Sequence, residues 1–135
     1  MSRPRTGAMS QIDLTRVLCR LSELPAEGCR EFRLGGGDWP LRGFVVQVAG
    51  GVRAYVNRCA HLHFPLNQRP HGFLTPDGSM ILCSMHGALF EKPTGYCVAG
   101  PCYGQSLIGL PIRIESDCVL LSDEVNVGAL AARYA

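Results

Sequence analysis

Two short groups of cysteine and histidine constrain this chain more than any other feature of its sequence. The first is Cys59-Ala60-His61 and the second is Cys83-Ser84-Met85-His86, with twenty-one residues between them. A tight turn after a cysteine lets a histidine one or two residues later point back toward its sulfur. Each segment can therefore offer one thiolate and one imidazole to a metal, and we call them the first and second ligand loops.

This ligand set suits more than one kind of metal site. Two cysteines and two histidines can hold a structural zinc, although zinc sites more often group cysteine with cysteine and histidine with histidine. One sulfur and one nitrogen in each loop instead suit a two-iron cluster, in which one iron takes both cysteines and the other takes both histidines. A structural zinc-binding interaction module remains the alternative from another functional class.

The residues after the second ligand loop favour the iron–sulfur cluster. Gly87 lets the backbone turn closely past a bound group, and Gly100-Pro101 predicts a stiff loop that lies over it. Between them, Thr94-Gly95 predicts a turn. A plain zinc site has no need of the His86-Gly87 pair or of the Gly-Pro loop.

With these features the chain resembles the Rieske 2Fe-2S family over about Val17 to Leu121. The resemblance implies an all-β fold, with a small antiparallel β-barrel or sandwich base and an inserted cluster-binding subdomain. It also implies a Rieske-type 2Fe-2S cofactor. Cys59 and Cys83 would ligate one iron, and His61 and His86 would ligate the other through Nδ1 at the protein surface.

The resemblance also implies a set of residues around the cluster that cover it or meet a redox partner. These residues are Leu62, His63, Phe64, Met85, Gly87, Ala88, Gly100 and Pro101. His63 lies close enough to His61 to compete for the iron. The Cys-x-His spacing favours His61, so we interpret His63 as a loop residue.

Residues at four positions predict whether the reduction potential of such a cluster is high or low. High-potential respiratory members of the family carry a serine and a tyrosine hydroxyl after the second histidine, where this chain has Ala88 and Phe90. Their bracing disulfide is missing too, because Phe64 and Met85 stand where its cysteines would fall. Since neither Ala88 nor Phe90 can donate a side-chain hydrogen bond, we predict a low-potential, ferredoxin-type protein.

The resemblance to the ferredoxins of ring-hydroxylating dioxygenases implies a one-electron carrier. It would pass electrons from a flavin-dependent reductase to a terminal oxygenase. The alternative is the small Rieske subunit of a larger oxidoreductase, such as an assimilatory nitrite reductase. No catalytic residue is expected, because an oxygenase needs a separate mononuclear iron site and only His63 and His71 remain, both interpreted as loop residues.

Composition limits the partners and the compartment. The 135 residues carry a net charge of +2, and the 18% that are charged form no long run, so nothing indicates a nucleic-acid surface. No apolar run approaches the roughly twenty residues of a membrane span. Met1–Ser10 lacks the apolar segment of a signal peptide. We therefore expect a cytoplasmic protein without nucleic-acid or membrane partners.

Five cysteines lie outside the ligand loops, and the odd total of seven fits a reducing compartment better than a disulfide framework. Cys19, Cys29 and Cys118 lie in apolar segments and are interpreted as buried thiols. Cys97 and Cys102 flank the Gly-Pro loop. Further ligation or a disulfide stays open for this pair, but structural thiols are favoured because the ligand set is complete without them.

The remaining segments predict domain organisation and short strands. We expect a flexible N-terminus over 1–15, a Rieske domain over 16–122 with a cluster-binding subdomain over about 58–102, and a tail over 123–135. Strands are expected at 29–34, 43–48, 52–57, 79–83, 88–91, 96–98, 107–110, 111–115 and 118–122. The apolar positions of 12–24 partly fit a helix, but the family resemblance implies a first strand at 16–20, which we favour. The segment 67–78 reads as an excursion into solvent, and the tail helix as too short to persist without docking.

Overall fold

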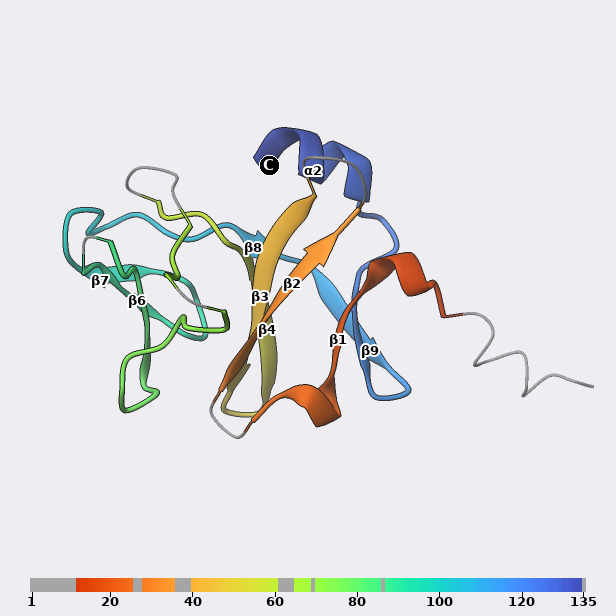
Figure 1. Cartoon of the computed structure of the whole chain (residues 1–135), viewed down its shortest axis with the longest axis horizontal. Coiled ribbons are helices and arrows are strands. Elements are labelled where there is room, and N and C mark those ends of the chain that lie inside the picture. The colour runs from red at the N-terminus through yellow and green to blue at the C-terminus, as the bar shows by residue number, and fades with distance from the viewer. Residues whose placement is uncertain are drawn as a thin grey trace, which may run out of the picture.

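The computed structural model describes residues 12–25, 28–35, 40–60, 65–68, 70–85 and 87–134. Across these ranges the fold consists of three antiparallel sheets and one short α-helix (Figure 1). The predicted all-β class is confirmed. The strands of the described ranges form open sheets rather than one closed barrel. None of the described helices is long and apolar enough to cross a membrane.

The largest sheet has the order β2-β3-β4-β8. Its strands are β2 (Cys29–Leu34), β3 (Leu41–Val48), β4 (Gly51–Val56) and β8 (Gly109–Leu110). The β3–β4 pair is a two-residue hairpin, because Val48 pairs with Gly51 across Ala49-Gly50. Gly50 has φ +82°, a conformation that this tight turn needs and that glycine adopts without steric cost.

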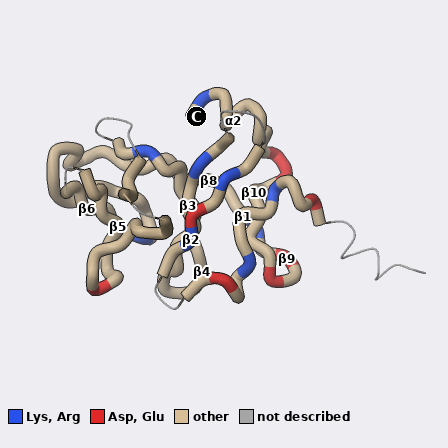
Figure 2. The backbone as a smooth tube through the Cα atoms, viewed as in Figure 1, with Lys and Arg blue, Asp and Glu red and all other residues tan. Residues whose placement is uncertain are grey.

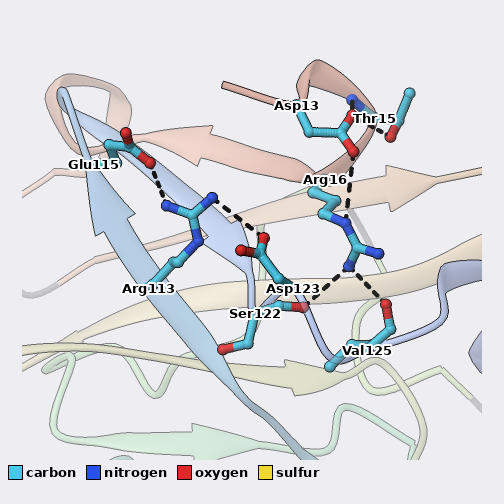
Figure 3. Close-up of polar contacts among 8 residues, drawn as sticks. All are labelled: Asp13, Thr15, Arg16, Arg113, Glu115, Ser122, Asp123 and Val125. Atoms are coloured by element: carbon cyan, nitrogen blue, oxygen red, sulfur yellow. Dashed lines mark hydrogen bonds and ion pairs between the residues drawn. The ribbon is translucent and has the colours of Figure 1, made fainter. Parts of the chain in front are cut away.

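The second sheet has the order β1-β10-β9. Its strands are β1 (Val17–Arg20), β10 (Cys118–Leu121) and β9 (Ile112–Glu115), with 3-10 turns η1 (Leu14–Arg16) and η2 (Leu21–Glu23) on either side of β1. The Arg16 guanidinium donates from Nη1 to the carbonyl oxygens of Ser122 (3.0 Å) and Val125 (2.6 Å), and an ion pair joins it to Asp13 (Figure 3). These bonds fasten the start of β1 to the chain that leaves β10.

The third sheet has the order β5-β6-β7 and lies in the chain between β4 and β8. Its strands are β5 (Met80–Leu82), β6 (Leu89–Glu91) and β7 (Cys97–Ala99), and they form the left-hand lobe in Figure 1. Each of these strands has three residues, so the lobe depends on packing against the larger sheet. The second ligand loop lies between β5 and β6 of this lobe, whereas the first follows β4 of the largest sheet.

Strand β3 supplies one face to each of two hydrophobic cores, because alternate residues of a strand point to opposite sides. Val45 belongs to the core between the two larger sheets, whereas Phe44 and Val46 belong to the core that contains both ligand-loop cysteines. We call the latter the thiol core. Its buried members are Cys29, Phe44, Val46, Tyr55, Cys59, Leu66, Phe73, Ile81, Cys83, Ala88, Phe90, Cys97, Cys102 and Leu107.

The expectation that residues 67–78 run out into solvent is wrong for the middle of this segment. Phe73 is fully buried and stacks on Phe44, with 4.2 Å between ring centroids. His71 is exposed, yet its Nδ1 accepts a hydrogen bond from the Glu31 backbone N–H (2.9 Å), and its carbonyl accepts from the Cys29 thiol (3.2 Å). Proline and glycine correctly indicated turns here, but they could not reveal that Phe73 has an apolar partner on β3.

The tail forms the helix α2 (Val127–Tyr134), which docks on the larger sheets as its short length requires. Val127, Leu130, Ala131 and Tyr134 are partly buried against the core between these sheets. Near its C-terminal end, the Arg133 carbonyl oxygen accepts from Arg58 Nη1 at 3.4 Å. The helix therefore contacts the residue that precedes the first ligand loop.

The cysteines outside the thiol core are free thiols. Cys19 is buried as predicted, and burial raises its pKa to about 11. Cys118 is only half-buried, a correction to the prediction, because it begins β10 beside the exposed Ser116-Asp117 turn.

Candidate metal centre

Both predicted cysteine ligands are buried in the thiol core. Cys59 follows β4 and is 1% exposed, and Cys83 follows β5 and is fully buried. The two sulfur-bearing residues are twenty-four positions apart in the sequence but share one packed interior. The structure therefore places in one hydrophobic core the two thiols that the family resemblance assigned to one iron.

The ends of the segment that contains the first ligand loop are joined by a buried asparagine, Asn57, which the sequence analysis did not identify. Asn57 Oδ1 accepts a hydrogen bond from the Leu66 backbone N–H (2.8 Å), and its Nδ2 donates to Asn67 Oδ1 (2.9 Å). Asn57 is the one buried polar residue among the described residues, so its hydrogen bonds satisfy groups that water does not reach. The only sequence signal was an amide side chain at the end of an apolar strand.

Backbone hydrogen bonds stabilise the second ligand loop internally and join it to Leu66, which follows the first ligand loop in sequence. Cys83 donates from its backbone N–H to the Ala88 carbonyl (2.9 Å), and its own carbonyl accepts from Gly87 (2.9 Å). The Ser84 N–H donates to the Leu66 carbonyl oxygen (2.8 Å). Since Leu66 is also held by Asn57, it links the segment that contains the first ligand loop to the second ligand loop.

The Gly100-Pro101 loop lies directly against the second ligand loop, as the sequence predicted. A Cβ at Gly100 would be 2.7 Å from the Ala88 Cα, closer than real Cβ atoms approach backbone. Gly100 also has φ +101°, which side chains rarely adopt. Ala88 is therefore sealed beneath this loop, whereas Pro101 is exposed. At position 87 glycine is required only by the backbone conformation, because φ is +76°. A Cβ added there would have no atom within 4 Å.

Two further thiols lie in the same core. Cys97 and Cys102 are 0% and 1% exposed, and the Cys102 thiol donates to the Cys97 sulfur at 3.1 Å. Cys97 donates in turn to the Ala99 carbonyl oxygen (3.1 Å). Burial raises the pKa of the Cys102 thiol to about 12, and hydrogen bonds with Cys97 and Cys59 act in the same direction. All seven cysteines are free, so the structure contains no Cys97–Cys102 disulfide.

Several predicted site residues lie outside the described residues, and their roles stay predictions. They are His61, Leu62, His63, Phe64 and His86. Among the predicted surface residues that are described, Met85 is 51% exposed. The described ranges hold no group of three or more cysteine, histidine or acidic side chains poised around a metal. The described donors, Cys59 and Cys83, fit the thiolate half of the predicted ligand set.

Comparisons with known proteins give the chain a family. The family model described as "Rieske [2Fe-2S] domain" matches residues 15–124. No curated protein matches the chain.

Solved structures share the fold. The terminal oxygenase of carbazole 1,9a-dioxygenase from Novosphingobium sp. KA1 is 22% identical, with a TM-score of 0.63 over 78% of this chain but 28% of the oxygenase chain. The Sphingomonas yanoikuyae B1 ferredoxin is 24% identical, with a TM-score of 0.59 over 79% of this chain and 96% of the ferredoxin. A chain in the complex of reduced oxygenase and oxidized ferredoxin in carbazole 1,9a-dioxygenase is 21% identical, with a TM-score of 0.59 and coverages of 78% and 90%.

Two glycines of one loop test the close approach to Ala88. Gly100 and Gly104 both have positive φ, at +101° and +90°, but a Cβ at Gly104 meets nothing within 4 Å. Gly104→Ala should lose about 1–2 kcal/mol of unfolding free energy from backbone strain alone. Gly100→Ala should lose about 1–3 kcal/mol more from overpacking against Ala88. Urea unfolding followed by circular dichroism measures both, and equal losses would contradict the close approach.

Proposed function

Because the chain belongs to the Rieske [2Fe-2S] domain family, we propose that it is a one-electron carrier between a flavin-dependent reductase and a terminal oxygenase. Family membership gives it a Rieske-type 2Fe-2S cluster as cofactor, in place of the zinc alternative. The observation that carries the proposal is the burial of Cys59 and Cys83 in one core, with Leu66 tying their loops together. When bound, the cluster supplies the one-electron redox change.

We assign the cluster ligands as Cys59 and Cys83 for one iron and His61 and His86 for the other. The buried thiol pair supports the first half of this assignment. Ala88 and the Gly100-Pro101 loop exclude water from the thiol side, because Gly100 lies against Ala88 without a gap.

The proposed partner surface is an apolar patch on the third-sheet lobe, formed by Met85, Tyr96, Pro101 and Tyr103. Tyr103 is 69% exposed, and its ring lies edge-on to Tyr96 with 6.4 Å between centroids. Residues 94–111 include no charged side chain. Figure 2 shows the charges gathered mainly on the larger sheets and the tail. An apolar, sparsely charged patch suits docking that excludes water and still dissociates quickly.

The oxygenase as acceptor is supported by the structural neighbours. One neighbour is a ferredoxin of similar size, and another comes from a complex of oxygenase with ferredoxin. The similarity to an oxygenase chain covers 28% of that chain, so it concerns one domain. The reductase is inferred from the chemistry of the role, since a one-electron carrier needs a donor that releases electrons singly, as flavins do.

Iron content and EPR test the cluster and its histidines. We expect two irons per chain, and in the dithionite-reduced protein a rhombic signal with average g below that of all-cysteine clusters. His86→Ala should abolish this signal, because one iron loses a ligand. His71→Ala is the matched control and should keep it, since His71 bonds to the Glu31 backbone instead. Bound zinc without the signal, in protein supplied with iron and kept from oxygen, would overturn the proposal.

The reduction potential tests the ferredoxin assignment. Ala88 and Phe90 are fully buried in the thiol core and offer no hydroxyl to the cluster. We therefore expect a midpoint in the lower part of the roughly −150 to +300 mV range of Rieske centres. An EPR-monitored redox titration measures it. A midpoint near the upper limit would place the protein with the quinol-oxidising members instead.

Matched surface substitutions test the docking patch. Met85→Glu places a charge beside the second ligand loop and should slow electron transfer to a terminal oxygenase about tenfold, equivalent to about 1.4 kcal/mol. Ile114→Glu is the control, because Ile114 is equally exposed (50% against 51%) but lies on β9. Stopped-flow absorbance gives the rates, and visible spectra check that the cluster is retained. Equal rates for both variants would remove Met85 from the docking surface.

A further inference from the structure

Two arginines lie directly opposite each other on neighbouring strands of the largest sheet. Arg33 of β2 pairs with Arg42 of β3 in the antiparallel register, so both side chains project from the same face of the sheet. Like charges directly opposite each other are destabilising. The stability of the sheet therefore gives no reason for this pair.

The two arginines line a cleft of about 220 Å³, which we call the arginine cleft. Its other lining residues are Glu31, Asn67, Gln68 and Pro70. Pockets for small molecules usually enclose about 300–1,000 Å³. The arginine cleft is smaller than such pockets, but it has room for the carboxylate of one side chain.

The lining of the arginine cleft carries a net positive charge, because Glu31 is the one acid beside the two arginines. Glu31 Oε1 accepts from Asn67 Nδ2 (3.1 Å), and its Oε2 lies 3.8 Å from Arg42 Nη2. The buried Arg42 Nε has no hydrogen-bond partner among the described residues. The Arg33 guanidinium likewise forms no hydrogen bond or ion pair with any described residue. Since a guanidinium has five N–H donors, the cleft has donors to spare for an anion.

One wall of the arginine cleft adjoins the proposed docking patch. Gln68 Nε2 donates to the Met85 sulfur at 3.9 Å, and Met85 lies beside the second ligand loop. On the same wall, Asn67 Oδ1 accepts from Asn57 Nδ2 (2.9 Å), and Asn57 also holds Leu66. The cleft is therefore built on residues that position the ligand loops, and it continues the docking patch at Met85.

We propose that the arginine cleft receives an acidic side chain of the terminal oxygenase, while an apolar surface of the oxygenase covers Met85. Guanidinium groups suit a carboxylate because their planar forks can donate two parallel hydrogen bonds, and such charged bonds are about twice as strong as neutral ones. The attraction speeds encounter and sets the orientation in which the ligand loops face the acceptor. This inference rests on the proposed function, since it names the chemistry that the partner presents.

The competing explanation is protection of a sheet edge. Strand β2 is at one end of the strand order in the largest sheet, and charged side chains on edge strands prevent pairing with other chains. This explanation applies to Arg30 of β2 as much as to Arg33. It does not account for Arg42, because β3 is an inner strand.

Matched arginine variants test the proposal with a terminal oxygenase that the wild-type protein reduces. The double variant Arg33→Gln, Arg42→Gln should reduce it about tenfold more slowly at low ionic strength, and its rate should depend less on salt. Arg30→Gln is the control, because the Arg30 side chain is 40% exposed against 38% for Arg42, but it projects from the opposite face of β2. Stopped-flow absorbance gives the rates, and visible spectra check that the cluster is retained. Equal slowing in the control, or none in the double variant, would overturn the proposal.

Chemical neutralisation of the oxygenase tests the acidic partner without altering this chain. Carbodiimide coupling of glycinamide converts exposed carboxylates of the oxygenase into neutral amides, and reduction by dithionite checks that its own redox centre is intact. The wild-type protein should then lose its advantage over the double variant. A wild-type advantage that survives the modification would overturn the proposal. So would a double variant that is slow only in accepting electrons from the reductase, because the cleft would then bind the donor.

Failure of this inference is distinguishable from failure of the proposed function. A cluster-loaded wild-type protein that reduces no terminal oxygenase at any salt concentration would overturn both. Fast reduction by the wild-type protein, together with an unchanged rate in the double variant, would overturn only the role of the arginine cleft.

Discussion

The two ligand loops depend on a short chain of hydrogen bonds through Leu66. Its N–H donates to the Asn57 side chain, and its carbonyl oxygen accepts from Ser84. Leu66 is fully buried, so breaking either of these two hydrogen bonds would leave one of its backbone groups unpaired at a cost of about 1–3 kcal/mol. Because Asn57 follows β4 and Ser84 follows β5, this chain also joins the third-sheet lobe to the largest sheet.

Aromatic packing against β3 also holds the third-sheet lobe in place. Phe44 of β3 stacks on Phe73, which comes from the segment between the ligand loops. The two faces of β3 thus serve different purposes: Val45 stabilises the larger sheets against each other, and Phe44 stabilises the metal-binding lobe. Three-residue strands could not hold the ligand loops alone, since so few ladder bonds do not offset the entropy of ordering the chain.

Much of the fold was predictable where a local pattern decides the structure. The strands expected at 29–34, 43–48 and 52–57 agree closely with β2 and with the β3–β4 hairpin. The Gly-Pro loop was predictable because Gly100 adopts a positive φ, which side chains other than glycine rarely permit. The burial of Phe73 was not predictable, because its partner Phe44 lies twenty-nine residues away in sequence. The role of Asn57 was likewise not predictable, because its hydrogen-bond partners Leu66 and Asn67 lie nine and ten residues away in sequence.

The sequence by itself determined the chemistry of the site: which thiols and imidazoles are available, at which spacing, and with which glycines beside them. These properties depend on neighbouring residues and on backbone conformations that only certain side chains permit. The tertiary structure alone decided that Cys59 and Cys83 share one core, that Leu66 links the chain after Cys59 to the second ligand loop, and that Cys97 and Cys102 lie in the same core. Each of these depends on packing between strands far apart in the chain, where contacts are set by the whole core and not by local propensity.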